Sequence, residues 1–227
     1  MINPIGFIIT ILYFKFSEFL RRFAFFKKFP PIVMTGILII LTLEIFNFDF
    51  EVYNESASFL TFMLIPATIA LGYPIYKNKQ LLLKNKRVIY SAFIIAMLIA
   101  ILGTYIVAKL CHTELIIMEA MLPKSVTAPI AVEISKEIGA IPELTACVVV
   151  LTGVFGAMFG HWLLRLVHVK NDVAIGLSIG AASHVVGTSS CIETKREKQI
   201  VMASVSFIIV GLIAAVIIPL FCMLMNS

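Results

Sequence analysis

Long runs of apolar residues alternate with short polar stretches along the whole chain of 227 residues. A run of about 20 apolar residues is long enough to cross a bilayer as a helix. About eight such segments follow one another, and they leave little room for a soluble domain. They cover residues 5–26, 32–46, 57–76, 88–110, 122–135, 144–167, 173–191 and 200–225. The pattern predicts an all-α, polytopic helical membrane protein.

The segment 122–135 is the most unusual, because it places helix-breaking and polar residues inside an apolar chain. Pro123 and Pro129 each remove a backbone donor and clash with the carbonyl four residues earlier, which excludes an unbroken helix. Interrupted backbone at membrane depth is tolerated where it lines a wet cavity, and Lys124, Ser125 and Thr127 suit such a lining. Alternatively, Lys124 snorkels to the headgroups and the hydroxyls bond their own backbone.

Two further segments contain helix breakers. Residues 57–76 include Pro66 and Pro74, and residues 173–191 include Gly187 within a polar stretch. We expect two segments of the chain to be interrupted or re-entrant, with breaks near Pro129 and Gly187 that face each other.

The segment 144–167 carries glycines of a different kind. Gly153, Gly156 and Gly160 form a small-residue ladder, which lets another helix pack closely against this one.

The first segment has charges in its second half, at Lys15, Glu18, Arg21 and Arg22. It therefore fits either a membrane span or an amphipathic basic helix in the interface. No basic region precedes its apolar run and no Ala-x-Ala site follows, which favours a retained segment over a cleaved signal peptide.

The composition excludes a water-soluble domain, since 60% of the residues are hydrophobic, 14% are charged and the mean hydropathy is +1.03. A net charge of +5 would favour nucleic acid as the partner of a soluble protein. Here the basic residues form short clusters between apolar runs, so we interpret them as topology signals that face anionic lipid. The scattered cysteines indicate no metal site, cofactor or disulfide framework. They are Cys111, Cys147, Cys191 and Cys222.

The basic loops predict the orientation in the membrane. The loop with Lys27 and Lys28 and the loop with Lys84 and Lys86 should be cytoplasmic, and the acidic loop around Glu51 should face outward. Basic loops also flank the segment 173–191 on both sides. Either this segment enters and returns without crossing, or one of the two loops breaks the rule.

No linker or charge block divides the chain, which predicts a single integral membrane domain, 1–227. A weak repeat lays residues 30–38 over 123–131 and residues 67–73 over 182–188, which would give halves 1–112 and 113–227. The spacing of the two blocks differs by about one membrane span, as an inverted repeat would require.

Four blocks together resemble the LrgB/CidB family. They are IPATIALGYPIYK at 65–77, LPKSVTAPIAVEIS at 122–135, LTGVFG at 151–156 and GAASHVVGT at 180–188. The resemblance covers nearly the whole chain. Members of this family are described as antiholin-like proteins that modulate murein hydrolase activity and autolysis. The plant plastid relative is a glycolate/glycerate translocator, and some bacterial relatives are linked to pyruvate uptake.

The resemblance implies a multi-pass protein of the bacterial cytoplasmic (inner) membrane that works with a small LrgA/CidA-type membrane protein. The expected partners are therefore the lipid bilayer, the LrgA/CidA-type protein and a small carboxylate solute. A homo-oligomer is also allowed, and no nucleic acid is expected.

A short hydroxy or keto monocarboxylate needs one cationic group and several hydroxyl donors. Lys124 supplies the charge, and the hydroxyls are those of Ser125, Thr127, Ser183 and Thr188. His184 lies in a polar membrane segment, and its titration range suits proton coupling. Alternatively, His184 is a packing histidine whose hydrogen bonds are satisfied within the protein. We assign no role to His112, His161 or His168.

Three classes of function are compatible with these residues. The first is a secondary carrier of small monocarboxylates of the glycolate, glycerate or pyruvate type. The second is an antiholin-like regulator that associates with the holin-like partner and transports nothing. The third is an intramembrane hydrolase that uses Ser183 or Ser189 with His184. The third is disfavoured, because neighbouring residues of a helix point to different faces and no orienting carboxylate is present in these segments. We therefore expect no enzyme.

Overall fold

The computed structural model describes residues 4–23, 26, 29–70, 72–77, 79–84 and 86–226, and in this part every regular element is a helix. The chain forms two compact units, Met1–Ala70 and Leu71–Ser227, which we describe separately. Lys27 and Lys28 of the predicted cytoplasmic loop lie outside the described residues. The helical fold class is confirmed. The single domain, the repeat halves and the count of eight spans stay predictions.

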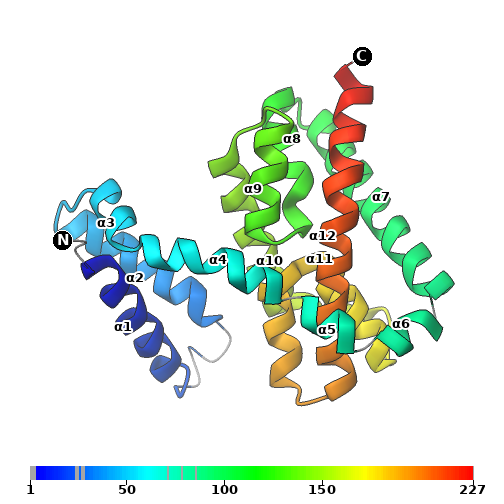
Figure 1. Cartoon of the computed structure of the whole chain (residues 1–227), viewed down its shortest axis with the longest axis horizontal. Coiled ribbons are helices and arrows are strands. Elements are labelled where there is room, and N and C mark those ends of the chain that lie inside the picture. Colours follow the sequence, from blue (N-terminus) through cyan, green and yellow to red (C-terminus); the bar gives the residue numbers. More distant parts are fainter. Residues whose placement is uncertain are drawn as a thin grey trace. The chain divides into compact units, whose positions relative to one another are not determined.

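The first unit contains four helices: α1 (Ile5–Leu20), α2 (Pro31–Ile45), α3 (Phe50–Ser56) and α4 (Ser58–Ala70) (Figure 1). Pro31 occupies the first turn of α2, where its missing N–H would be unpaired in any case. Asp49 caps α3 by accepting a 2.8 Å hydrogen bond from the Glu51 N–H. The helix α1 ends before Arg21, so it is shorter than the predicted segment 5–26.

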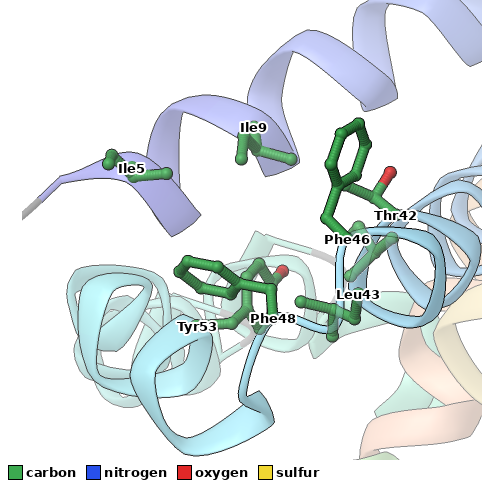
Figure 2. A pocket seen from close by; sticks show the side chains of 8 residues that line it. Ile5, Ile9, Thr42, Leu43, Phe46, Phe48 and Tyr53 are labelled. Atoms are coloured by element: carbon green, nitrogen blue, oxygen red, sulfur yellow. The ribbon is translucent and has the colours of Figure 1, made fainter.

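Short polar contacts join the helices of this unit. The Gly6 N–H donates to Ser56 Oγ at 2.9 Å, and a Cβ at this glycine would lie 2.6 Å from Tyr53 O. Hydroxyl pairs at 2.7 Å (Thr10 and Tyr53) and 2.6 Å (Tyr13 and Thr42) add to this contact. Thr42 and Tyr53 also line an apolar pocket of about 320 Å³ (Figure 2), and both hydroxyls already have partners. Its lining is Ile5, Ile9, Ile39, Thr42, Leu43, Phe46, Phe48 and Tyr53.

The second unit contains the remaining helices. They are α5 (Gly72–Lys77), α6 (Lys79–Lys84), α7 (Lys86–Leu110), α8 (Leu115–Met121), the 3₁₀ turn η2 (Leu122–Ser125), α9 (Ala128–Glu137), α10 (Pro142–Leu166), α11 (Asp172–Glu193) and α12 (Glu197–Asn226). Figure 1 shows α12 as the long helix against which α7, α9 and α11 pack.

The core of this unit lies along α12. Val205, Val210 and Ile218 of α12 are buried with Phe93 of α7 and Val149 of α10. Much of the opposite, outward surface of α7, α10 and α12 is also apolar, and exposed apolar surface of this extent indicates a lipid environment.

Four helices within the described residues are long and apolar enough to cross a membrane. They are Ile89–Leu110, Pro142–Leu166, Asp172–Glu193 and Glu197–Met225. They correspond to four of the predicted segments and support a multi-pass membrane protein.

One of the predicted helix breaks needs correction, because the helix α4 runs through Pro66 without interruption. Pro74 lies in the first turn of α5, so the break near this residue stays a prediction. A proline removes only one hydrogen bond of the helical ladder, and packed membrane helices often absorb that loss. Residue 71, which separates α4 from α5, lies outside the described residues.

Candidate functional site

The first interrupted segment runs from α8 through η2 into α9. Pro123 has non-helical backbone angles (φ −82°, ψ 18°), and Val126 is extended (φ −100°, ψ 165°). The helix α9 restarts at Ala128 and holds Pro129 in its first turn, where proline favours helix initiation. The interruption predicted near Pro129 therefore lies just before this residue.

Lys124 projects from this interruption toward α7. Its ammonium is half-buried and donates to Thr104 Oγ1, and Thr104 in turn donates to Ala100 O at 2.8 Å. None of the ion pairs within the described residues includes Lys124. Lys124 and Thr104 line one pocket of about 400 Å³, whose other lining residues include Gly103 and Cys111 and no carboxylate.

The hydroxyls that follow Lys124 are buried. Ser125 is 7% exposed and Thr127 is 5% exposed. Thr127 Oγ1 makes no hydrogen bond within the described part of the chain. An unpaired buried hydroxyl costs about 1–3 kcal/mol, so this atom requires an explanation beyond folding.

The second interruption lies inside α11, at Ser183 (φ −135°, ψ 16°) and His184 (φ 42°, ψ −143°). It therefore occurs about one helical turn before Gly187, where the sequence predicted it. His184 adopts backbone angles that are costly for any residue except glycine. Thr188 Oγ1 donates to His184 O at 2.8 Å, so this hydroxyl is used by the helix itself.

The imidazole of His184 is 2% exposed and lies 2.9 Å from Val149 O of α10. A carbonyl oxygen only accepts hydrogen bonds, so His184 Nε2 carries a proton. Nδ1 of this ring makes no hydrogen bond to any residue that the structure describes.

The glycine ladder of α10 faces this interruption. A Cβ at Gly153 would lie 2.7 Å from His184 Cε1, and one at Gly156 would overlap the side chain of Ser183. Gly160 leaves more room, because its Cβ would lie 3.5 Å from Ile179. The missing side chains of Gly153 and Gly156 therefore provide the space that the broken turn of α11 occupies.

The two interruptions share a neighbour in α10. Val149 accepts the His184 hydrogen bond, and its side chain belongs to the same buried cluster as Leu122 and Val126. Lys124 and His184 themselves make no hydrogen bond with each other. The structure thus brings both predicted breaks against one stretch of α10, and it directs the lysine toward α7.

Two polar groups escaped the sequence analysis. Thr104 is a single threonine within an apolar run, and that was the only signal for it. His161 received no role, although it takes part in a polar network with Ser190 and Gln199. Both contacts join residues far apart in the chain, which single-sequence patterns do not reveal.

Comparisons with known proteins agree on one family. The profile of the LrgB-like family matches residues 10–224. Proteins named "Antiholin-like protein LrgB" from Bacillus mycoides (strain KBAB4) and Bacillus cereus (strain B4264) are each 35% identical over 221 residues, covering 97% of this chain and 93% of theirs. No solved structure matches the chain. The chain therefore belongs to the LrgB-like family, as its sequence blocks predicted.

Proposed function

We propose that this protein is a secondary carrier of small monocarboxylates in the bacterial cytoplasmic membrane. The observation that carries the proposal is the half-buried Lys124, which lines a pocket beside a broken helix and has no carboxylate partner among the described residues. A lysine within the hydrocarbon region costs about 2.5–3.5 kcal/mol on insertion scales, and an anionic solute would offset part of that cost.

Hydroxyl groups would complete the recognition of a hydroxy or keto acid. Ser125 and Thr127 lie one and three residues after Lys124 in the chain, and Thr127 Oγ1 has no hydrogen-bond partner within the described residues. Ser183 is buried at the second break. Thr188 is the weakest of the proposed ligands, because its hydroxyl already donates within α11.

His184 is the proposed site of proton coupling. Its Nε2–H is held by Val149 O, so uptake of a proton would occur at Nδ1. Both forms of the ring keep the bond to Val149, and the charged form would require a nearby anion in this buried position. The proton and the carboxylate would therefore favour each other's binding.

Uptake of labelled glycolate, glycerate and pyruvate into liposomes that contain the purified protein tests this proposal. Lys124→Met should abolish uptake while the protein still inserts, and Lys124→Arg should restore it only in part. Lys109 is an exposed lysine of α7 that lies 5.7 Å from the Tyr105 ring centroid. Lys109→Met is the matched control and should transport normally.

In His184→Gln, uptake should lose its dependence on pH between about 5 and 8.

The carrier proposal fails if Lys124→Met transports like the parent, or if the parent carries none of these acids under any gradient. The second candidate would then replace it, namely an antiholin-like regulator that controls murein hydrolase activity and autolysis through an LrgA/CidA-type partner. The name of the Bacillus relatives supports this candidate. Gly153 and Gly156 are occupied by α11, so such a partner would dock on the outward apolar faces of α7, α10 or α12. Copurification of the two proteins from a common membrane would measure this association.

A further inference from the structure

A strongly basic pocket lies where the ends of α10, α11 and α12 meet. It shares no residue with the pocket of Lys124. Its volume is about 610 Å³. The lining consists of His161, Arg165, Val169, Lys170, Ile175, Thr194, Arg196 and Gln199. Both loops that border it, 167–171 and 194–196, connect membrane-spanning helices, so the pocket lies at the ends of the spans.

A hydrogen-bond network fixes the floor of this pocket. Gln199, which is 2% exposed, donates from its Nε2 to Asp172 Oδ1 at 2.7 Å. Arg196 Nη1 binds the same oxygen at 2.8 Å. The single carboxylate of the network is therefore already paired, and it holds Arg196 and Gln199 in position.

Arg165 and Lys170 are left without a counterion. Neither residue forms an ion pair within the described residues. Because Asp172 balances only Arg196, the pocket retains two uncompensated positive charges. An electropositive concave site of this kind attracts anions.

Hydrogen-bond contacts also fix the position of His161 in this wall. Gln199 presents Oε1 to His161 Nε2 at 3.2 Å, because its own Nε2 faces Asp172. Ser190 Oγ lies 3.3 Å from His161 Nδ1 and already donates its hydrogen to Gly187 O at 2.7 Å. These contacts hold the imidazole in the wall of the pocket through Gln199 and Ser190.

We propose that this pocket binds a phosphate-bearing anion, either the headgroup of an anionic phospholipid or a free phosphate compound. A phosphate offers two negative charges or several acceptor oxygens, which match Arg165, Lys170 and the fork of Arg196. Its place at the ends of the spans is the depth at which lipid phosphates lie. The inference does not depend on the carrier function.

Binding to the purified full chain tests the proposal with two probes. Inorganic phosphate is titrated against chloride at constant ionic strength, and phosphatidylglycerol is compared with phosphatidylcholine by native mass spectrometry. The variant Arg165→Gln/Lys170→Gln removes the two unpaired charges. The control Lys195→Gln/Lys198→Gln removes the same net charge from exposed positions next to the pocket that do not line it.

We expect at least one probe to bind the parent and the control equally and to bind the pocket variant at least about tenfold more weakly. Phosphate binding would identify a free anion, and selective phosphatidylglycerol binding would identify a lipid. Equal losses in the pocket variant and the control would show a general charge effect and overturn the proposal. Binding of neither probe to the parent would overturn it as well.

Discussion

Two helices of the second unit, α11 and α12, differ in continuity in the opposite way to what their proline content predicts. The helix α12 contains Pro219 and runs unbroken over 30 residues. The helix α11 contains no proline and is interrupted at Ser183 and His184. For these two helices, the packing around the helix therefore decides whether it breaks, and proline within it does not.

The neighbours of each helix explain this difference. Around α11, Gly153 and Gly156 of α10 leave space for the side chains of the broken turn, and His184 finds an acceptor in Val149 O. Such a hydrogen bond and tight packing offset the cost of the unusual backbone angles, which is about 1–3 kcal/mol. The core of α12 offers no such gap, since Ala203, Ala214 and Ile218 are fully buried.

The first prediction has the largest expected effect on stability, and it concerns the contact between the interrupted helix α11 and the continuous helix α12. In Gly180→Ala, the new methyl group would overlap the backbone of Ala203 in α12, which no rotamer change can relieve. We expect a loss of about 3 kcal/mol, or roughly 6–12 °C in the midpoint of thermal unfolding in detergent.

Gly160→Ala is the matched control for this substitution. Its methyl group would lie in ordinary contact with Ile179, at 3.5 Å, and alanine favours a helix over glycine by about 1 kcal/mol. The midpoint should stay constant or rise. Equal losses in both variants would contradict the close approach of α11 and α12 at Gly180.

This contrast also shows what the sequence could predict. Apolar runs and the family blocks were sufficient for the helical membrane fold, because hydrophobic length is encoded locally. Pro123 and Pro129 located the first interruption, since proline limits its own backbone. The break at His184 was misplaced by a turn, because positive φ at a non-glycine residue arises from tertiary packing that a sequence does not display.

The second prediction concerns the anchor between α10 and the other interrupted segment. Thr145 of α10 is fully buried, donates to Ala120 O at 2.8 Å and lies 2.8 Å from Ser135 Oγ. Thr145→Val removes the hydroxyl that both groups contact, which should cost about 1–3 kcal/mol in the free energy of unfolding. Thr152→Val should be nearly neutral by the same measurement, because within the described residues the Thr152 hydroxyl bonds only Val148 O of its own helix. Comparable losses at both positions would argue against the anchor.

The third prediction tests the interruption of α11 itself. At position 184, glycine should give a protein more stable than alanine by about 1–2 kcal/mol, because both lose the imidazole and only glycine accepts the backbone angles without strain. At the exposed position 215 of α12, Ala215→Gly should instead destabilise by about 1 kcal/mol. Unfolding midpoints of His184→Gly, His184→Ala and Ala215→Gly provide the comparison. If alanine is the better residue at both positions, α11 is as continuous as α12.

The last prediction concerns Thr127, where we expect the smallest effect on stability and a large effect on transport. Its Oγ1 is buried and makes no hydrogen bond to the residues that the structure describes, so Thr127→Val removes a polar atom that weakens the fold. We expect unfolding to be unchanged or shifted upward by up to about 1 kcal/mol, in contrast to the loss at Thr145. Uptake of carboxylates into liposomes should nevertheless fall, because the solute loses one of its proposed hydrogen-bond donors. A stability loss as large as that of Thr145→Val would mean that the Thr127 hydroxyl is bonded in the folded protein. Unchanged uptake would mean that this hydroxyl does not contact the solute, and it would confine the proposed site to Lys124 and its pocket against α7.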